Sequence, residues 1–270
     1  MPFITVNNVK LYYEEQGSGS ETLVFGHSML FNLRMFDDQV AVLKAKYRCI
    51  SFDFRGQGQS EVTDCGYDLE SLTEDTAKLL KALNTQPCHF VGFSMGGMVA
   101  MRLAVQFPDL IKSLVLIDTS SERQDNMLRN RILIVIAQYF GLKVLAAKVM
   151  SMFFGSQFLK DPQRKALRHS WKAYFLANDP KGIVHVVKGV IFREPITETL
   201  KYIKQPTLIM VGEEDELTDL KKAQIIHDNI AHSTLHIIPN AAHMGPVEEP
   251  EFVTKTIAKF LKTKTNTYDS

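Results

Sequence analysis

Short apolar runs alternate with amphipathic helical patterns along most of this 270-residue chain. Apolar residues recur at helical spacing in the segment after residue 94 and in residues 69–83, 220–230 and 251–261. The runs that predict strands lie at residues 3–6, 10–16, 21–26, 47–53, 88–93, 113–118, 206–212 and 234–239. Because strands connected through helices run parallel and are covered on both faces, the pattern predicts an α/β fold with a mostly parallel, eight-stranded sheet.

Residues 122–200 break this alternation. They read as about four consecutive helices, separated by the turn signals GS, DP and NDP. Because open α/β sheets bind their ligands at the carboxyl edge of the strands, we predict that this segment is an all-helical lid over that edge. The predicted core then consists of residues 1–121 and 201–270, and residues 122–200 are inserted between its two parts.

The stretch VGFSMGG, residues 91–97, places a serine between a predicted strand and a predicted helix. The small neighbours Gly92 and Gly96 let the backbone pass closely through a tight turn, which raises the hydroxyl of Ser94 above the sheet. The N-terminus of the following helix favours negative charge at this point. We interpret Ser94 as a nucleophile, and the competing interpretation is a serine that only caps the helix.

A serine hydroxyl needs a base to remove its proton, and His243 is the best placed of the eight histidines. It lies between the last predicted strand and the last helix, at the sheet edge where Ser94 lies. An acid is needed to orient the histidine. The segment VGEEDELTD offers Asp215 among several carboxylates, and Asp118, at the end of another predicted strand, is an alternative.

With these residues in place, the chain resembles the α/β-hydrolase superfamily over nearly its whole length. The segments FGHSM, DFRGQGQS, GFSMGG, VGEEDELTD and NAAHMGPVEEPEFV occur in the order and spacing of that family. Within it, the chain looks most like 3-oxoadipate enol-lactonases and related small esterases. The resemblance implies that Ser94 is the nucleophile, Asp215 the acid and His243 the base. It also implies that the N–H groups of Met29 and Met95 form the oxyanion hole.

Four further residues are expected to contact the substrate. His27 and Ser28 lie in the oxyanion loop; many relatives have His-Gly there, and the hydroxyl of Ser28 either faces the substrate or caps the turn. Phe140 and Trp171 belong to the apolar side of the predicted lid, part of which should line an acyl pocket. The lid contains 13 Lys and Arg against 6 Asp and Glu. This excess either steers an anionic substrate or only solvates the outer face of the lid.

The sequence therefore predicts a serine hydrolase that cleaves a carboxylic ester or lactone without a metal or organic cofactor. A C–C bond hydrolase, a cofactor-free haloperoxidase or perhydrolase, and an acyltransferase are alternatives on the same three residues. A ligand-binding receptor on a hydrolase scaffold is a further alternative. The net charge of +1 gives no reason to expect a nucleic-acid partner. We expect a small-molecule partner with an apolar acyl part and, because no signal-peptide pattern is present, a cytoplasmic location. Membrane contact is not favoured, but a cationic, apolar lid that touches membranes or accepts lipid esters is an alternative.

Overall fold

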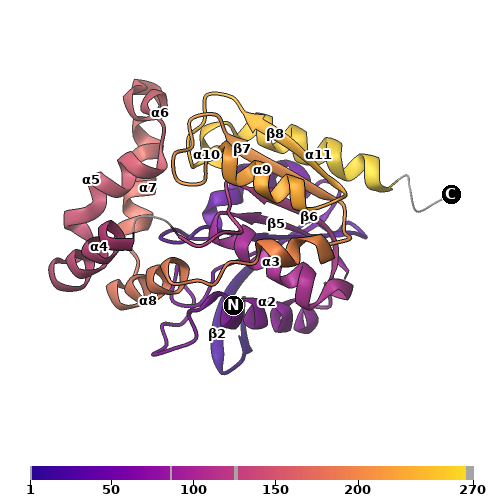
Figure 1. Ribbon diagram of the computed structural model, residues 1–270, viewed down its shortest axis with the longest axis horizontal. Helices are drawn as coiled ribbons and strands as arrows, with labels where there is room; N and C mark the ends of the chain where they lie inside the picture. Colours follow the sequence, from indigo (N-terminus) through magenta and orange to yellow (C-terminus); the bar gives the residue numbers. More distant parts are fainter. Residues whose placement is uncertain (1, 86, 125–126, 266–270) are drawn as a thin grey trace.

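The computed structural model describes residues 2–85, 87–124 and 127–265, and the predicted eight-stranded α/β sheet is confirmed. The strands pair in the order β1-β2-β4-β3-β5-β6-β7-β8. Strands β3 to β8 are parallel to their neighbours among themselves, whereas β2 is antiparallel to both β1 and β4. The strands are β1 Phe3–Val6, β2 Val9–Gln16, β3 Thr22–Gly26, β4 Arg48–Phe52, β5 Cys88–Phe93, β6 Ile111–Ile117, β7 Thr207–Gly212 and β8 Ser233–Ile238 (Figure 1).

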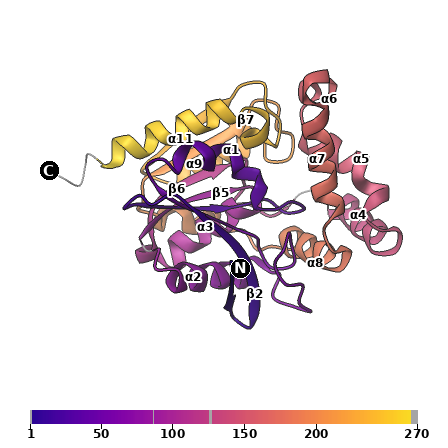
Figure 2. The same cartoon turned by 180° about the vertical axis from the view of Figure 1, so that it is seen from behind.

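Helices cover both faces of the central strands. Every residue of β3, β5 and β7 is buried, because alternate side chains of each strand enter the apolar cores on opposite sides. Helices α1 (Asp37–Leu43) and α11 (Pro250–Thr265) pack together on one face. Helices α2 (Leu69–Ala82), α3 (Met95–Gln106) and α9 (Leu220–Asn229) cover the other. Figures 1 and 2 show the two helical layers from opposite sides.

Five helices lie between β6 and β7, in the segment predicted as a lid, and we call them the helical insertion. They are α4 Met127–Phe140, α5 Leu142–Phe153, α6 Ser156–Lys160, α7 Lys165–Leu176 and α8 Pro180–Ile191. The sequence suggested about four helices, because Gly141 did not stand out as a boundary. Gly141, with a φ of +76°, separates α4 from α5. In Figures 1 and 2 the insertion lies beyond one edge of the sheet, apart from the helices on its faces.

Short helical turns complete the structure, and they are η1 Leu33–Phe36, η2 Pro108–Leu110, η3 Pro162–Arg164, η4 Thr197–Tyr202 and the one-turn helix α10 Gly245–Glu248. Within residues 2–85, 87–124 and 127–265, no helix combines the length and the apolar character needed to cross a membrane.

Candidate active site

Ser94 occupies a strained turn between β5 and α3. Its φ of +51° is in the left-handed region that non-glycine residues rarely adopt, and its N–H donates to the carbonyl of Ile117 at 2.9 Å. A Cβ on Gly96 would lie 2.0 Å from the carbonyl oxygen of Gly26, so only glycine fits at this position. The hydroxyl of Ser94 makes no capping bond to α3. The interpretation of Ser94 as a simple helix cap is therefore not supported.

Three side chains from three separate loops meet at this turn. The Oγ of Ser94 lies 3.0 Å from Nε2 of His243, and Nδ1 of His243 lies 2.9 Å from Oδ2 of Asp215. All three residues are buried. Because an ionised carboxylate only accepts hydrogen bonds, Nδ1 carries the proton in this arrangement, which leaves Nε2 free to accept the proton of the serine.

Asp215 is held as an anion by its neighbours. Its Oδ1 accepts from the N–H groups of Leu217 and Thr218, and the hydroxyl of Thr218 donates to Oδ2 at 2.7 Å. Burial alone would raise the pKa of Asp215, but the charge that His243 carries when protonated, the hydrogen bond from that ring and the bonds from Thr218 outweigh burial, so the pKa lies below its usual value. Thr218 also lies 3.2 Å from Nδ1 of His243. Sequence analysis missed Thr218, although it follows Asp215 by three residues.

Asp118, the alternative acid, faces a different group. Its Oδ1 accepts from the N–H of Gly212 at 2.7 Å, and no hydrogen bond joins it to His243 in the described part of the chain. Complete burial, together with the negative charge of Asp215, raises the pKa of Asp118 well above its usual value. Because Asp118 binds Gly212 and its burial disfavours the ionised form, it is poorly suited to stabilise an imidazolium on His243.

The loop that is predicted to form the oxyanion hole is held by the ring of His27. The Nε2 of His27 accepts from the N–H of Phe54 at 3.0 Å, and Nδ1 lies 2.6 Å from the carbonyl of Ser28. Burial lowers the pKa of His27 to about 4, so this ring is neutral and both its nitrogens bind main-chain groups. The N–H of Leu30 donates to Oε1 of Gln57 at 2.7 Å, which anchors the far side of the loop.

A cavity of about 120 Å³ opens beside Ser94 and His243. Apart from these two residues and Thr218, the polar lining residues in the described part of the chain are Gln124 and Lys148. The remaining lining is apolar, contributed by α4, α5, α7 and α8 of the insertion and by core residues such as Met29. The ring of Phe153, which also lines the cavity, packs edge-on against the ring of His243 at a centroid distance of 5.2 Å.

The structure does not bring the four residues that were predicted to contact substrate into this cavity. His27 and Ser28 are fully buried and do not line the cavity, and the hydroxyl of Ser28 has no hydrogen-bond partner among the described residues. Trp171 is buried between other aromatic rings, 5.3 Å from that of Phe31. Phe140 lies on the outside of the insertion and is 70% exposed. Of the predicted oxyanion residues, Met29 lines the cavity and Met95 is the first residue of α3.

Glu248 connects the histidine loop to the insertion and was not predicted. Its Oε1 accepts from the N–H groups of Ala242 and Met244, each at 3.2 Å, on either side of His243. Its Oε2 accepts from the N–H of Gly155, at the start of α6, at 2.9 Å. Burial raises the pKa of this carboxyl group to about 7, although the three N–H donors oppose that shift.

The chain matches the family described as alpha/beta hydrolase fold over residues 21–250. It is 26% identical to 3-oxoadipate enol-lactonase 2 of Acinetobacter baylyi, covering 96% of both chains. The enol-lactonase of Burkholderia xenovorans has a similar structure, with a TM-score of 0.90 and 25% identity over 97% of this chain and 100% of that one. An esterase from Exiguobacterium antarcticum has a TM-score of 0.88 and 25% identity over 96% of this chain and 98% of that one. The family match spans most of the sequence, and the protein therefore belongs to the alpha/beta hydrolase fold family.

Proposed function

We propose that this protein is a serine hydrolase that cleaves a carboxylic ester or lactone through an acyl-enzyme intermediate. The observation that carries the proposal is the continuous hydrogen-bonded chain from Ser94 through His243 to Asp215 beside an apolar cavity. An imidazole nitrogen 3.0 Å from a strained serine hydroxyl is the arrangement that nucleophilic catalysis requires.

In the proposed acylation, Nε2 of His243 takes the proton of Ser94 as its Oγ attacks the ester carbonyl carbon. Asp215 stabilises the imidazolium that forms. The carbonyl oxygen becomes an oxyanion, which the N–H groups of Met29 and Met95 would bind. Loss of one such donor typically costs about 10²–10³ in kcat. The imidazolium then gives its proton to the leaving alkoxide, and the alcohol departs.

Deacylation repeats these steps with water as the nucleophile. His243 takes a proton from the water, and the resulting hydroxide attacks the acyl carbon. The imidazolium then returns a proton to Oγ of Ser94 as the acyl–oxygen bond breaks and the carboxylic acid is released. A second strong base near Ser94 is not needed, because one histidine serves both halves of the reaction.

The cavity favours an acyl group that is a hydrocarbon chain. Apolar side chains of the insertion make up most of its lining, and a carboxylate buried among them would lose its hydration without gaining a matched partner. Lys148 is the only cationic residue among those that line the cavity, and its side chain is exposed. We therefore propose a neutral, apolar acyl group, with the insertion acting as a lid that supplies its pocket.

The first test is hydrolysis of p-nitrophenyl esters by wild type and by Ser94→Ala, together with labelling by a fluorophosphonate. We expect turnover and a single covalent adduct in the wild type, and neither in Ser94→Ala. Ser170→Ala, which removes an exposed hydroxyl on α7, is the matched control and should behave as wild type. Turnover that persists in Ser94→Ala would contradict the proposed nucleophile.

The proposed preference for a neutral acyl group is tested with two substrates whose acyl chains have equal length. The p-nitrophenyl ester of hexanoate and the mono-p-nitrophenyl ester of adipate differ mainly in the terminal carboxylate. We expect kcat/KM to be at least about tenfold higher for the hexanoate, because only the adipate must desolvate a charge. A preference for the adipate would show that the pocket is built for an anion, and would leave the serine mechanism intact.

A further inference from the structure

The insertion exposes a band of apolar side chains that no described part of the chain covers. Three of its members, Ile132, Val135 and Tyr139, follow one another at intervals of three and four residues along α4, so they share one side of that helix. Phe140 and Val144 continue the band across the α4–α5 junction. These five side chains, which we call the outer stripe, are between 50% and 74% exposed.

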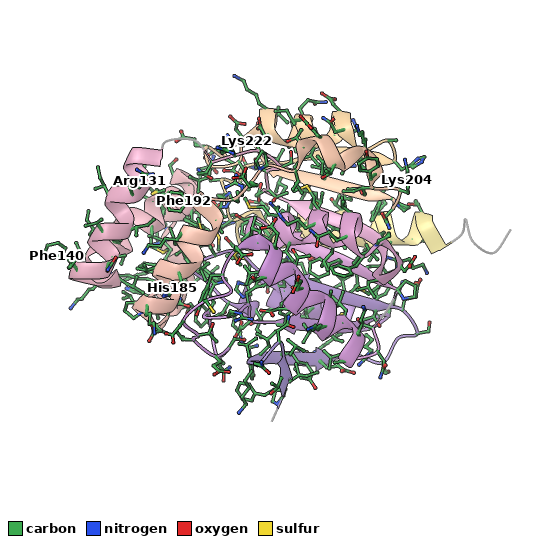
Figure 3. The ribbon with its side chains drawn as sticks, turned by 60° about the horizontal axis from the view of Figure 1, so that its bottom comes forward. Arg131, Phe140, His185, Phe192, Lys204 and Lys222 are labelled. Carbon is green, nitrogen blue, oxygen red and sulfur yellow. The ribbon has the colours of Figure 1, made fainter. Side chains whose placement is uncertain are left out.

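The outer stripe is not the side of α4 that faces the cavity. Ile134 and Ala137, on the opposite side of the same helix, are buried and line the cavity beside Ser94. In Figure 3, Phe140 lies at the tip of the insertion farthest from the sheet. An α-helix that is apolar on two opposite sides is normally buried on both, and large exposed apolar patches mark interaction sites.

The charges around the outer stripe have one sign. Residues 127–160, which span α4, α5 and α6, contain five Lys and Arg and no Asp or Glu. Arg131 and Lys143 are exposed on α4 and α5, beside members of the stripe. The guanidinium of Arg131 lies 5.6 Å from the ring centre of Phe192, a further exposed apolar side chain, and Figure 3 shows the two side by side.

This combination does not suit a second copy of the chain. A symmetric dimer formed through the stripe would bring two such cationic segments together, and juxtaposed like charges oppose association. Packing the stripe against the more acidic core of another copy would be a head-to-tail contact, which continues into open assemblies unless it closes into a ring. An anionic surface with an apolar interior satisfies both the charges and the apolar side chains.

We propose that the outer stripe docks on an anionic phospholipid bilayer. Tyr139, Phe140 and Val144 enter the boundary between headgroups and acyl chains, and the flanking cations Arg131 and Lys143 contact the lipid phosphates and carboxylates. In the docked state α4 lies between the lipid and the acyl cavity. This surface interaction goes beyond hydrolysis and does not depend on it, so it can be tested with the intact chain whatever its substrate.

Vesicle flotation provides the test, with phosphatidylcholine vesicles that either contain or lack phosphatidylserine. We expect wild type to float with the anionic vesicles only, and to be released at high salt because the lipid contribution is electrostatic. The double variant Tyr139→Ser/Phe140→Ser should bind at least about tenfold more weakly, and Lys143→Glu should also weaken binding. Val42→Ser, which removes a side chain that is 60% exposed on α1, should bind as wild type.

Three results would overturn the proposal. The first is wild type that does not float with anionic vesicles, and the second is a double variant that floats as well as wild type. The third is a wild-type dimer in light scattering that the double variant lacks, which would assign the stripe to a second copy. Unchanged circular dichroism and unchanged turnover of a short-chain ester in the double variant would show that the fold is intact, because neither Tyr139 nor Phe140 lines the cavity.

Discussion

Replacing Glu248 by glutamine should remove a pH-dependent loss of stability that the wild-type protein undergoes above pH 5. The pKa of this carboxyl group rises from 4.5 in a free side chain to about 7 in the folded chain. Between those values the folded state binds more protons than the unfolded state, so the free energy of unfolding falls as the pH rises. The contribution of Glu248 to stability is therefore greatest below pH 4.5, and it is lost as the pH rises through about 7.

The magnitude follows from the shift, since one pKa unit corresponds to about 1.4 kcal/mol. Between pH 5 and pH 8, the deprotonation of Glu248 should lower the free energy of unfolding of the wild type by roughly 2–3 kcal/mol. Glu248→Gln should not show this decrease. The side-chain amide of glutamine also places an N–H₂ donor against one of the three main-chain N–H donors. The free-energy cost of this mismatch does not change with pH. The difference in unfolding free energy between the two proteins should therefore shift by roughly 2–3 kcal/mol in favour of the variant from pH 5 to pH 8.

Urea unfolding at both pH values measures this difference. The chain has one tryptophan, Trp171, buried in the insertion, so its fluorescence and far-ultraviolet circular dichroism can be followed together. Glu251→Gln, which removes an exposed carboxylate at the start of α11, is the matched control and should give a nearly constant difference. A constant difference for Glu248→Gln as well would refute the assignment of Glu248 as the carboxyl group that titrates near neutral pH.

Two further pairs of variants test the acid and the turn. Asp215→Asn should lower kcat in ester hydrolysis by about 10³–10⁴-fold, because asparagine stabilises the wrong tautomer of the histidine. Asp118→Asn should lower kcat far less, and the reverse order would make Asp118 the acid. Gly96→Ala places a Cβ 2.0 Å from the carbonyl oxygen of Gly26 and should prevent stable folding, as thermal unfolding would show. Gly141→Ala has no atom within 4 Å of the new Cβ and should cost only about 1–2 kcal/mol of backbone strain, so equal losses would contradict the steric argument.

The sheet could be predicted because its strands are short apolar runs with clear boundaries. Strand residues 88–93 and helix residues 69–83 were predicted within one or two residues of β5 and α2. Helix α1, Asp37–Leu43, was missed because seven residues contain too few turns for a helical period to stand out. The insertion was divided incorrectly at Gly141, since a single glycine can also lie within a helix.

The proximity of Ser94, Asp215 and His243 could be predicted because their positions follow from topology. Parallel strands end at one edge of the sheet, and the loops with Ser94, Asp215 and His243 all leave from that edge. Thr218 and Glu248 could not be recognised in the same way, because they act on a neighbouring side chain or on main-chain N–H groups, and the sequence carries no pattern for such partners.

The sequence also did not predict which side chains of the insertion point toward the cavity and which point outward. The segment ILIVIA, residues 132–137, is apolar at every position, so its spacing does not distinguish an inner from an outer side of α4. Phe140 was expected in the acyl pocket and lies outside it, while Phe153, on the next helix, contacts the histidine. Which apolar residues point inward depends on how α4, α5 and α8 pack against one another.

The division of the cavity between core and insertion has a practical consequence for engineering. The proposed catalytic groups are supplied by loops of the core, whereas most of the apolar wall comes from one uninterrupted stretch of chain between β6 and β7. A transplant of that stretch from a related hydrolase would require only two splice points, after Ile117 and before Thr207. The walls of the cavity could in this way be exchanged as one unit, while Ser94, His243 and Asp215 stay in their original positions.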